Sequence, residues 1–333
     1  MRIQYDTMCR EFARVLLKKG FTERNAEDAA KIFADNSLFG VYSHGLNRFP
    51  VVVDYLEKGV IDPQKEPECI LQAGCMERWD GKRGFGPLNA KKAMERACGL
   101  ASIHGIGLVA LGNNNHWMRG GTYGWQAAEK GFIGICWSNT MPNMPVWGAK
   151  DRRIGNNPFV MAIPRSNGEH ILLDMAMSQY SYGKVEQCRL QNTALPLPGG
   201  YDSDGNLTTN PSEIEKTGRF IPMGYWKGSG MSIVLDLAAT VLSDGNSVKD
   251  IGELHEEIGL TQIMIAIDPE KLSDRERINE RVDEIIEDIK SSMPVEEGKA
   301  FFYPGERAVN SMKENIEKGI PVIEEKWQAV LNM

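Results

Sequence analysis

Three apolar segments near the middle of the chain constrain its fold most strongly, because the links between them do not read as helices. Residues 132–138, 158–163 and 171–177 each have the length and composition of a strand. The links 139–157 and 164–170 are rich in Pro, Gly and Asn and lack a helical period, which favours hairpins or meanders over β-α-β crossovers. We therefore predict an α/β chain of the α+β-like kind, with a mixed, antiparallel-rich sheet and no doubly wound Rossmann core.

A glycine pattern at residues 105–110 supports the same conclusion. Gly105-Ile106-Gly107-Leu108-Val109-Ala110 has the spacing G-x-G-x-x-A of a dinucleotide-binding turn. However, residues 89–103 read as a helix before the glycines, and 106–111 read as a strand after them. A dinucleotide-binding turn needs the opposite order, so that phosphate meets helix N–H groups. We interpret these glycines as a turn.

Helices are predicted at both ends of the chain. Residues 5–40 read as two amphipathic helices, in which Gly20 ends the first and Thr22 caps the second. A last helix at 322–331 is expected to fold back on the N-terminal helices, since chain termini often lie close together.

The sequence also suggests where two other helices begin. Segment 41–50 reads as irregular. Pro50 is expected to interrupt the helical structure, so that a short helix begins after it at 51–56. Residues 273–276 read as a capping box at the start of another helix. The apolar residues of that helix keep helical spacing: Ile278, Val282, Ile285, Ile286 and Ile289.

A possible phosphate site precedes the apolar helix predicted at 231–242. Lys227 and the Gly-Ser-Gly turn 228–230 come directly before it, where N–H groups and the helix dipole attract anions. The same letters also describe an ordinary tight turn, and the pattern alone leaves both interpretations open. Residues 262–267 read as one more strand.

Composition excludes several classes of protein. The net charge is −7 and the basic residues are scattered, whereas a nucleic-acid binder would carry a basic stripe. No apolar run suits a signal peptide or a membrane span, and the six cysteines form no C-x-x-C pair. We therefore expect a cytoplasmic protein with reduced, mostly packed thiols. An anionic ligand must be held by local cations, of which the chain offers Arg48, Lys150, Arg152, Arg153, Lys227 and Arg307.

His44 is the first candidate for acid/base chemistry. It lies in the irregular segment 41–50, next to the Ser43 hydroxyl and four residues before Arg48. Loops on a rigid scaffold often carry catalytic groups, and an imidazole near an arginine suits a substrate with a carboxylate beside a carbonyl. A structural hydrogen bond would explain the same histidine without any function.

The other histidines are weaker candidates for acid/base chemistry. His116 lies in a polar, glycine-bounded stretch with Trp117 and Arg119, which either lines a pocket or is a loop with one aromatic anchor. His104 ends a helix, and His255, among Glu253, Glu256 and Glu257, is expected on the surface. No histidines pair at the spacing of metal ligands, so we predict no metal site.

Four long motifs resemble the malate/L-lactate dehydrogenase family of the non-Rossmann kind, and within it the branch that reduces 2,3-diketo-L-gulonate. The resemblance spans nearly the full chain. The motifs are V-Y-S-H-G-L-N-R-F-P (41–50), H-G-I-G-L-V-A-L (104–111), N-H-W-M-R-G-G-T-Y-G-W-Q-A-A-E-K-G-F-I-G-I-C-W (115–137) and P-M-G-Y-W-K-G-S-G-M-S-I-V-L-D (222–236).

The resemblance implies a homodimer, a helical domain built from both termini, and a cofactor held between domains without a glycine turn. It implies three domains: helical (1–72 plus 310–333), α/β (73–122 plus 240–309), and a sheet-rich domain (123–239) for cofactor and substrate.

The resemblance also assigns roles to residues. His44 is the implied acid/base and Arg48 holds the substrate carboxylate, with Ser43 adjacent, while we expect His116 to support them. The implied cofactor contacts are His170, Ile171, Leu172, Leu173, Asp174, Met175, Ala176, Trp226, Lys227, Gly305, Glu306 and Arg307.

Asp174 is a charged residue in a strand otherwise fit for burial, so it is expected to be paired. It is our candidate for a carboxylate that raises the pKa of His44. The chain departs from the family at Asn156, where a threonine is common, and in a longer loop at 165–169.

We therefore predict an oxidoreductase that uses NADH, or alternatively NADPH, to reduce a small anionic 2-oxo acid. The resemblance favours 2,3-diketo-L-gulonate as that acid. The alternatives are a malate-, lactate- or ureidoglycolate-type dehydrogenase and a sugar-acid binding protein without redox chemistry.

Overall fold

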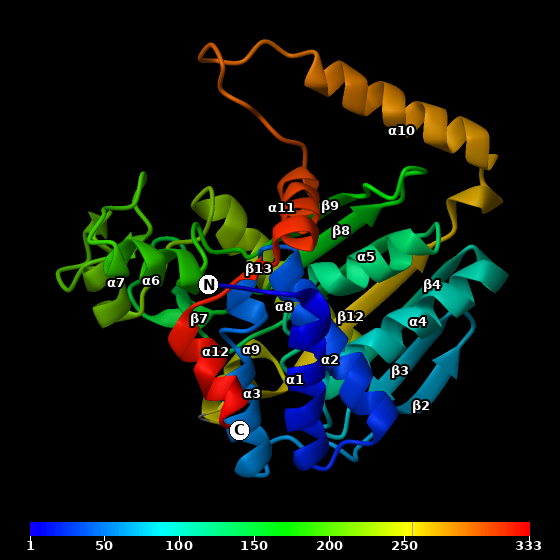
Figure 1. Cartoon of the computed structure of the whole chain (residues 1–333), viewed down its shortest axis with the longest axis horizontal. Coiled ribbons are helices and arrows are strands. Elements are labelled where there is room, and N and C mark those ends of the chain that lie inside the picture. The colour runs from blue at the N-terminus through cyan, green and yellow to red at the C-terminus, as the bar shows by residue number, and fades with distance from the viewer. Residues whose placement is uncertain (255) are drawn as a thin grey trace.

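The computed structural model describes residues 1–254 and 256–333, so the surface position expected for His255 lies outside the described residues. Figure 1 labels most of the elements. The helical segments are α1 (Tyr5–Lys18), α2 (Glu23–Leu38), η1 (Tyr42–His44), α3 (Phe49–Glu57), α4 (Gly86–His104), α5 (Gly121–Glu129), α6 (Tyr182–Leu190), α7 (Pro211–Thr217), α8 (Trp226–Ser243), α9 (Val248–Glu253), η2 (Pro269–Lys271), α10 (Arg275–Lys290), α11 (Glu306–Lys318) and α12 (Glu324–Leu331). The strands are β1 (Arg2–Ile3), β2 (Glu68–Ala73), β3 (Met76–Asp80), β4 (Ile106–Asn115), β5 (Ile133–Ser138), β6 (Met144–Pro145), β7 (Arg152–Ile154), β8 (Phe159–Ile163), β9 (Ile171–Met175), β10 (Gly200–Tyr201), β11 (Leu207–Thr208), β12 (Ile258–Ile267) and β13 (Ile320–Pro321).

The main sheet of the described residues has the strand order β2-β3-β4-β12-β5-β8-β9. Within it β3 pairs with β4 in parallel, while the other neighbouring strands are antiparallel. Strands β5, β8 and β9 are successive strands of the main sheet and pair side by side, and the link 139–157 between β5 and β8 contains the small hairpin β6–β7. The predicted meander and the mixed, antiparallel-rich sheet are confirmed.

The glycines at 105–107 serve a turn and close packing. Gly105 caps α4 with a φ of 84°, and β4 begins at the next residue. A Cβ on Gly107 would lie 2.1 Å from the Ala97 carbonyl oxygen, so only glycine lets β4 approach α4 this closely. The order is helix, glycine, strand, which confirms that this is no dinucleotide-binding turn.

Helices cover both faces of the sheet. Along β4, Val109 and Leu111 pack into the core under α4 and α5, whereas Ala110 packs into the core under α8. Successive side chains of a strand point to opposite faces. The central strands of the sheet are therefore buried between two helical layers, whereas the edge strand β2 is exposed.

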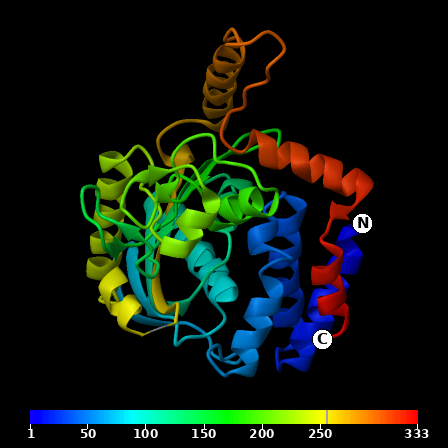
Figure 2. The same ribbon diagram turned by 90° about the vertical axis from the view of Figure 1, so that its left-hand side faces the viewer.

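A separate helical lobe is built from both ends of the chain. Strand β1 pairs with β13, and Trp327 and Val330 of α12 share a hydrophobic core with Phe12 of α1 and Phe33 of α2. Figures 1 and 2 show the two termini on the same side of the molecule, with α12 beside α1. The predicted return of the last helix is confirmed.

Two helices begin earlier than predicted. Helix α3 starts at Phe49, so Pro50 lies in its first turn and does not interrupt the helix. A missing N–H costs nothing at this position. Helix α8 starts at Trp226, so residues 228–230 belong to the helix and form no turn before it.

Helix α10 forms as predicted but with a different cap. Asp274 is the N-cap and its side chain accepts from the Arg277 N–H, so the capping box expected at 273–276 is wrong. Of its apolar residues Ile286 is buried, while Ile285 remains 53% exposed. Figure 2 shows why: α10 projects from the body of the molecule.

Candidate active site

Helix α2 fixes the turn that carries His44. Asn36 Nδ2 donates to the His44 carbonyl oxygen at 3.0 Å, and Ser37 Oγ accepts from the Leu46 N–H at 3.0 Å. Both of these polar side chains are fully buried. Gly45 packs so tightly that a Cβ would lie 2.1 Å from Ser37 Oγ. Buried hydrogen bonds and close packing thus give His44 a defined position within a short loop.

We expect Gly45→Ala to lower the free energy of unfolding by about 1–3 kcal/mol, because the added methyl overpacks the contact with α2. The matched control is Gly99→Ala, since a Cβ at this position of α4 meets no atom within 4 Å. The control is expected to keep or raise stability, as Ala favours a helix over Gly by about 1 kcal/mol. Urea denaturation of both variants checks this, and equal effects would contradict it.

His44 and His116 lie side by side at the site. Their ring centroids are 5.8 Å apart and the ring planes differ by 20°. Ser43 Oγ lies 3.0 Å from His44 Nδ1. His116 Nδ1 accepts from the Met118 N–H at 3.0 Å, so the neutral His116 ring carries its proton on Nε2.

Both imidazoles are neutral at pH 7. Burial lowers the pKa of His44 to about 4, and nearby His116, Arg48 and Arg119 act in the same direction. Burial also lowers the pKa of His116 to about 3, with Arg48 as the second cause. This corrects the expectation that the pKa of His44 is ordinary or raised. In the free site His44 accepts a proton, and an anion bound beside it would favour the charged form.

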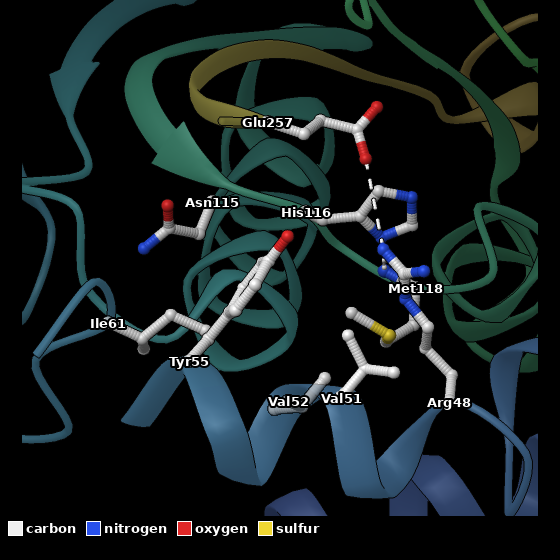
Figure 3. A pocket seen from close by; sticks show the side chains of 9 residues that line it. All are labelled: Arg48, Val51, Val52, Tyr55, Ile61, Asn115, His116, Met118 and Glu257. Carbon is white, nitrogen blue, oxygen red and sulfur yellow. Dashed lines mark hydrogen bonds and ion pairs between the residues drawn. The ribbon is translucent and has the colours of Figure 1, made fainter. Parts of the chain in front are cut away.

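Arg48 and Glu257 face each other across a pocket. Arg48 Nη2 lies 3.9 Å from Glu257 Oε2. Figure 3 shows both side chains with Tyr55 and His116, whose polar atoms lie around the same space. The other residues that line this pocket are Val51, Val52, Ile61, Asn115 and Met118. A guanidinium in a partly apolar pocket can bind a carboxylate bidentately.

Asp174, on the edge strand β9, is paired as expected, but with Arg119. Its Oδ2 accepts from the Gly121 N–H at 3.0 Å and lies 3.5 Å from Arg119 Nε. Arg119 is buried, and its guanidinium also lies over the Phe39 ring. Among the described residues no ion pair within 4.0 Å joins Asp174 to His44. The carboxylate acts to raise the pKa of His44, but burial prevails.

The segments predicted to contact the cofactor meet along β9. At its start, the Leu172 N–H donates to the Pro304 carbonyl at 3.0 Å, and a Cβ on Gly305 would lie 2.9 Å from Leu172 N. Just beyond its end, the Met223 N–H donates to the Met177 carbonyl at 2.8 Å. The beginnings of α11 and α8 are thereby placed at the two ends of β9.

Several of the predicted contact residues already have partners within the protein. His170 Nδ1 accepts from the Arg165 N–H at 3.0 Å, and Glu306 Oε1 pairs with Lys290 Nζ at 2.8 Å. Leu172 is buried in the core, whereas its neighbours Ile171, Leu173, Met175 and Ala176 are half-buried. The predicted contact residues along β9 therefore have mainly backbone atoms and apolar side chains available for a ligand.

The start of α8 does not offer the free N–H groups that its sequence suggested. The Gly228 N–H donates to the Met223 carbonyl at 2.9 Å, and the Ser229 N–H donates to the Tyr225 carbonyl at 3.2 Å. Continuing the helix through these residues uses their donors. At this end of α8 the side chains of Trp226 and Lys227 are exposed.

Asn156 and the loop 165–169, where the chain departs from the family, both make defined contacts. Asn156 Oδ1 accepts from Thr140 Oγ1 at 3.0 Å and from Asn143 Nδ2 at 2.8 Å. The loop 165–169 is tied to α10, because Arg165 Nε pairs with Asp283 at 2.6 Å.

Sequence reasoning missed the pocket residues Glu257 and Tyr55. Glu257 lies in a charged stretch with Glu253 and Glu256, and no pattern there distinguishes the glutamate that immediately precedes β12 from its exposed neighbours. Tyr55 shares a helix turn with Val51 and Val52, so its place on α3 was the available signal. Trp117 is a buried anchor, while His116 lines the pocket, so both readings of their loop hold in part.

Among the described residues no cluster of three or more His, Cys, Asp or Glu side chains has the arrangement of a metal site. No described helix has the length and hydropathy needed to cross a membrane.

Comparison with known proteins agrees with this architecture. The family model for malate/L-lactate dehydrogenase matches residues 3–331. A 2,3-diketo-L-gulonate reductase of Escherichia coli O1:K1 is 47% identical over 331 residues, which cover 99% of each chain. Sulfolactate dehydrogenase of Methanocaldococcus jannaschii superposes with a TM-score of 0.89 at 29% identity, covering 99% of this chain and 95% of that one. Malate dehydrogenase of Pyrococcus horikoshii gives 0.90 at 29% identity, covering 100% and 94%. The chain therefore belongs to the malate/L-lactate dehydrogenase family.

Proposed function

We propose that this protein reduces a small 2-oxo acid to the 2-hydroxy acid with NADH, and that 2,3-diketo-L-gulonate is the acid. As a member of this family the chain is an oxidoreductase acting on a CH–OH group. The observation that carries the proposal is that Ser43, His44, His116 and Arg48 gather at one site, where the charge of Asp174 on β9 also acts on His44. The full-length identity to a 2,3-diketo-L-gulonate reductase supports this choice of substrate.

In this mechanism Arg48 holds the substrate carboxylate and His44 moves the proton. Ser43 contacts Nδ1 of His44, which leaves Nε2 to protonate the carbonyl oxygen as negative charge develops there. When bound, the nicotinamide supplies the hydride to the carbonyl carbon. In the opposite direction, neutral His44 accepts the hydroxyl proton. The substrate carboxylate adds negative charge near Arg48, which favours the protonated imidazole during reduction.

The residues along β9 fit a dinucleotide. The exposed cations Lys227 and Arg307 stand at the beginnings of α8 and α11, which flank β9 at opposite ends. Half-buried apolar side chains on the strand lie between them. A cation at either end of the strand suits the diphosphate, and the apolar surface between the two cations suits a ring.

We expect Lys227→Ala to weaken NADH binding about three- to tenfold, because an exposed charge contact to phosphate is worth about 1 kcal/mol. The affinity for the 2-oxo acid is expected to change less. Fluorescence titration of NADH measures the first effect, with Lys326→Ala on α12 as a control of equal charge. A larger loss of substrate affinity than of NADH affinity would place this end of α8 on the substrate side.

We also propose that the protein is a homodimer. Val234, Leu237 and Val241 form a stripe on α8 and are 60%, 60% and 78% exposed. Contiguous exposed apolar surface marks interaction sites, and self-association buries such a stripe.

Light scattering at micromolar concentration is expected to give twice the chain mass of 37.1 kDa. The double variant Val234→Glu/Val241→Glu is expected to be a monomer, whereas Ile103→Glu, at an exposed apolar site outside the stripe, is expected to remain a dimer. A monomeric wild-type protein would contradict the proposal.

We propose a cytoplasmic location as well, which the free thiols support because a reducing compartment keeps cysteines unpaired. Cys98, Cys136 and Cys188 are buried, Cys9 and Cys75 are half-buried, and Cys69 is exposed, so only part of the expected packing holds.

A panel of acids tests the function. Absorbance at 340 nm is followed with NADH or NADPH and 2,3-diketo-L-gulonate, pyruvate, oxaloacetate or a ureidoglycolate-type 2-oxo acid. We expect the highest kcat/KM with 2,3-diketo-L-gulonate and NADH. Preference for another acid would make the protein a malate- or lactate-type dehydrogenase, and no oxidation of either cofactor would favour a sugar-acid binding protein.

A further inference from the structure

Glu257 carries a half-buried carboxylate in the same pocket as Arg48. It lies one residue before β12, and its Oε2 is 3.9 Å from Arg48 Nη2, which is too far for a hydrogen bond. Burial raises the pKa of Glu257, although Arg48 and the Met141 backbone act to lower it. The carboxylate is therefore incompletely stabilised by its surroundings, and it gains from a further hydrogen-bond donor.

The pocket wall offers few other partners for this carboxylate. Val51, Val52, Ile61 and Met118 contribute apolar surface. Figure 3 shows the Tyr55 hydroxyl directed into the space bordered by His116 and Glu257. A ligand group that enters this space thus meets an acceptor, a hydroxyl and apolar walls.

The positive charge of Arg48 in the pocket is already partly balanced by Glu257. Arg48 brings one positive charge, and Glu257 stands close enough to share it. A substrate with one carboxylate on Arg48 leaves Glu257 to interact with the remainder of the molecule. A second carboxylate in the same pocket would face Glu257 with like charge, which disfavours binding.

We propose that Glu257 determines substrate specificity: it accepts hydrogen bonds from hydroxyl groups of the substrate and excludes acids that carry a second carboxylate. The proposal rests on the proposed function, since it takes the Arg48 side of the pocket as the place of the substrate carboxylate. It names the substrate class as polyhydroxy 2-oxo monocarboxylates.

The test variant is Glu257→Gln, which removes the charge and keeps the shape, and the matched control is Glu256→Gln, an exposed neighbour on the same segment. kcat/KM is measured with NADH and 2,3-diketo-L-gulonate, pyruvate or oxaloacetate. In Glu257→Gln we expect the oxaloacetate-to-pyruvate ratio to rise at least about tenfold and the diketogulonate-to-pyruvate ratio to fall by a similar factor. Glu257→Asp keeps the charge and is expected to keep most of the discrimination against oxaloacetate.

A binding measurement separates this proposal from the proposed function. Calorimetry of the NADH-loaded protein compares L-gulonate, a hydroxylated monocarboxylate, with L-malate, a dicarboxylate. Glu257→Gln is expected to bind malate at least about tenfold more tightly and gulonate more weakly, whether or not the protein turns over any acid. Unchanged ratios in both assays would overturn the role of Glu257, whereas a wild-type protein that binds the acids but oxidises no NADH would overturn the proposed function alone.

Discussion

The His44→Ala variant is expected to lose about 100- to 10,000-fold in turnover of the best 2-oxo acid, while its affinity for NADH stays near that of the wild type. General acid catalysis contributes a factor of this size. The effect follows from the position of the ring, which lies within hydrogen-bonding distance of Ser43, beside the His116 ring and near Arg48. The control is His104→Ala, which removes an exposed imidazole at the end of α4. Near-native turnover in His44→Ala would move the search for the acid to His116.

The rate of the same reaction is expected to change with pH in a defined direction. The pKa of His44 is about 4 in the free protein, so kcat/KM for reduction is expected to fall as pH rises above that value. In the opposite direction, kcat/KM rises as pH increases through the same value and then stays level. Substrate bound on Arg48 raises the pKa of His44, so the kcat profile for reduction is displaced to higher pH. A profile of kcat/KM for reduction that rises with pH would contradict His44 as the proton donor.

Arg48→Lys is expected to raise KM for the 2-oxo acid at least about tenfold, which corresponds to about 1.4 kcal/mol, with NADH binding unchanged. A planar guanidinium binds a carboxylate through two parallel hydrogen bonds, which an ammonium cannot copy. Initial rates over a range of substrate concentrations measure the change. Arg153→Lys is the matched control, because this exposed arginine pairs with Asp151 on the surface. An unchanged KM would remove Arg48 from the substrate site.

The sheet was predictable because its strongest signals are local. The helix–glycine–strand order at 105–107 and the link 139–157 each follow from a few residues, and the structure confirms both. Helix starts were less predictable: Pro50 and Gly228 read as helix breakers, yet the chain places both within the first turns of helices. Pro50 suits the first turn of α3, where its missing N–H costs nothing, whereas in α8 the surrounding structure overrides the local preference of Gly228.

The site was only partly predictable, because its chemistry depends on residues far apart in sequence. The Ser43–His44–Arg48 cluster lies within one short motif and could be found there. The pairing of Asp174 with Arg119 and the place of Glu257 opposite Arg48 depend on where strands β9 and β12 lie relative to distant segments of the chain. The low pKa of His44 follows from burial and nearby cations, which no local pattern reports.

Transfer of deuterium from the cofactor to the product tests the central claim most directly. The protein is incubated with 2,3-diketo-L-gulonate and NADH deuterated at the transferable C4 position, and the hydroxy-acid product is analysed by mass spectrometry. We predict that the product gains one deuterium on the carbon that bears the new hydroxyl, and that His44→Ala forms this product far more slowly. A product without deuterium, or no product that depends on NADH, would contradict the account.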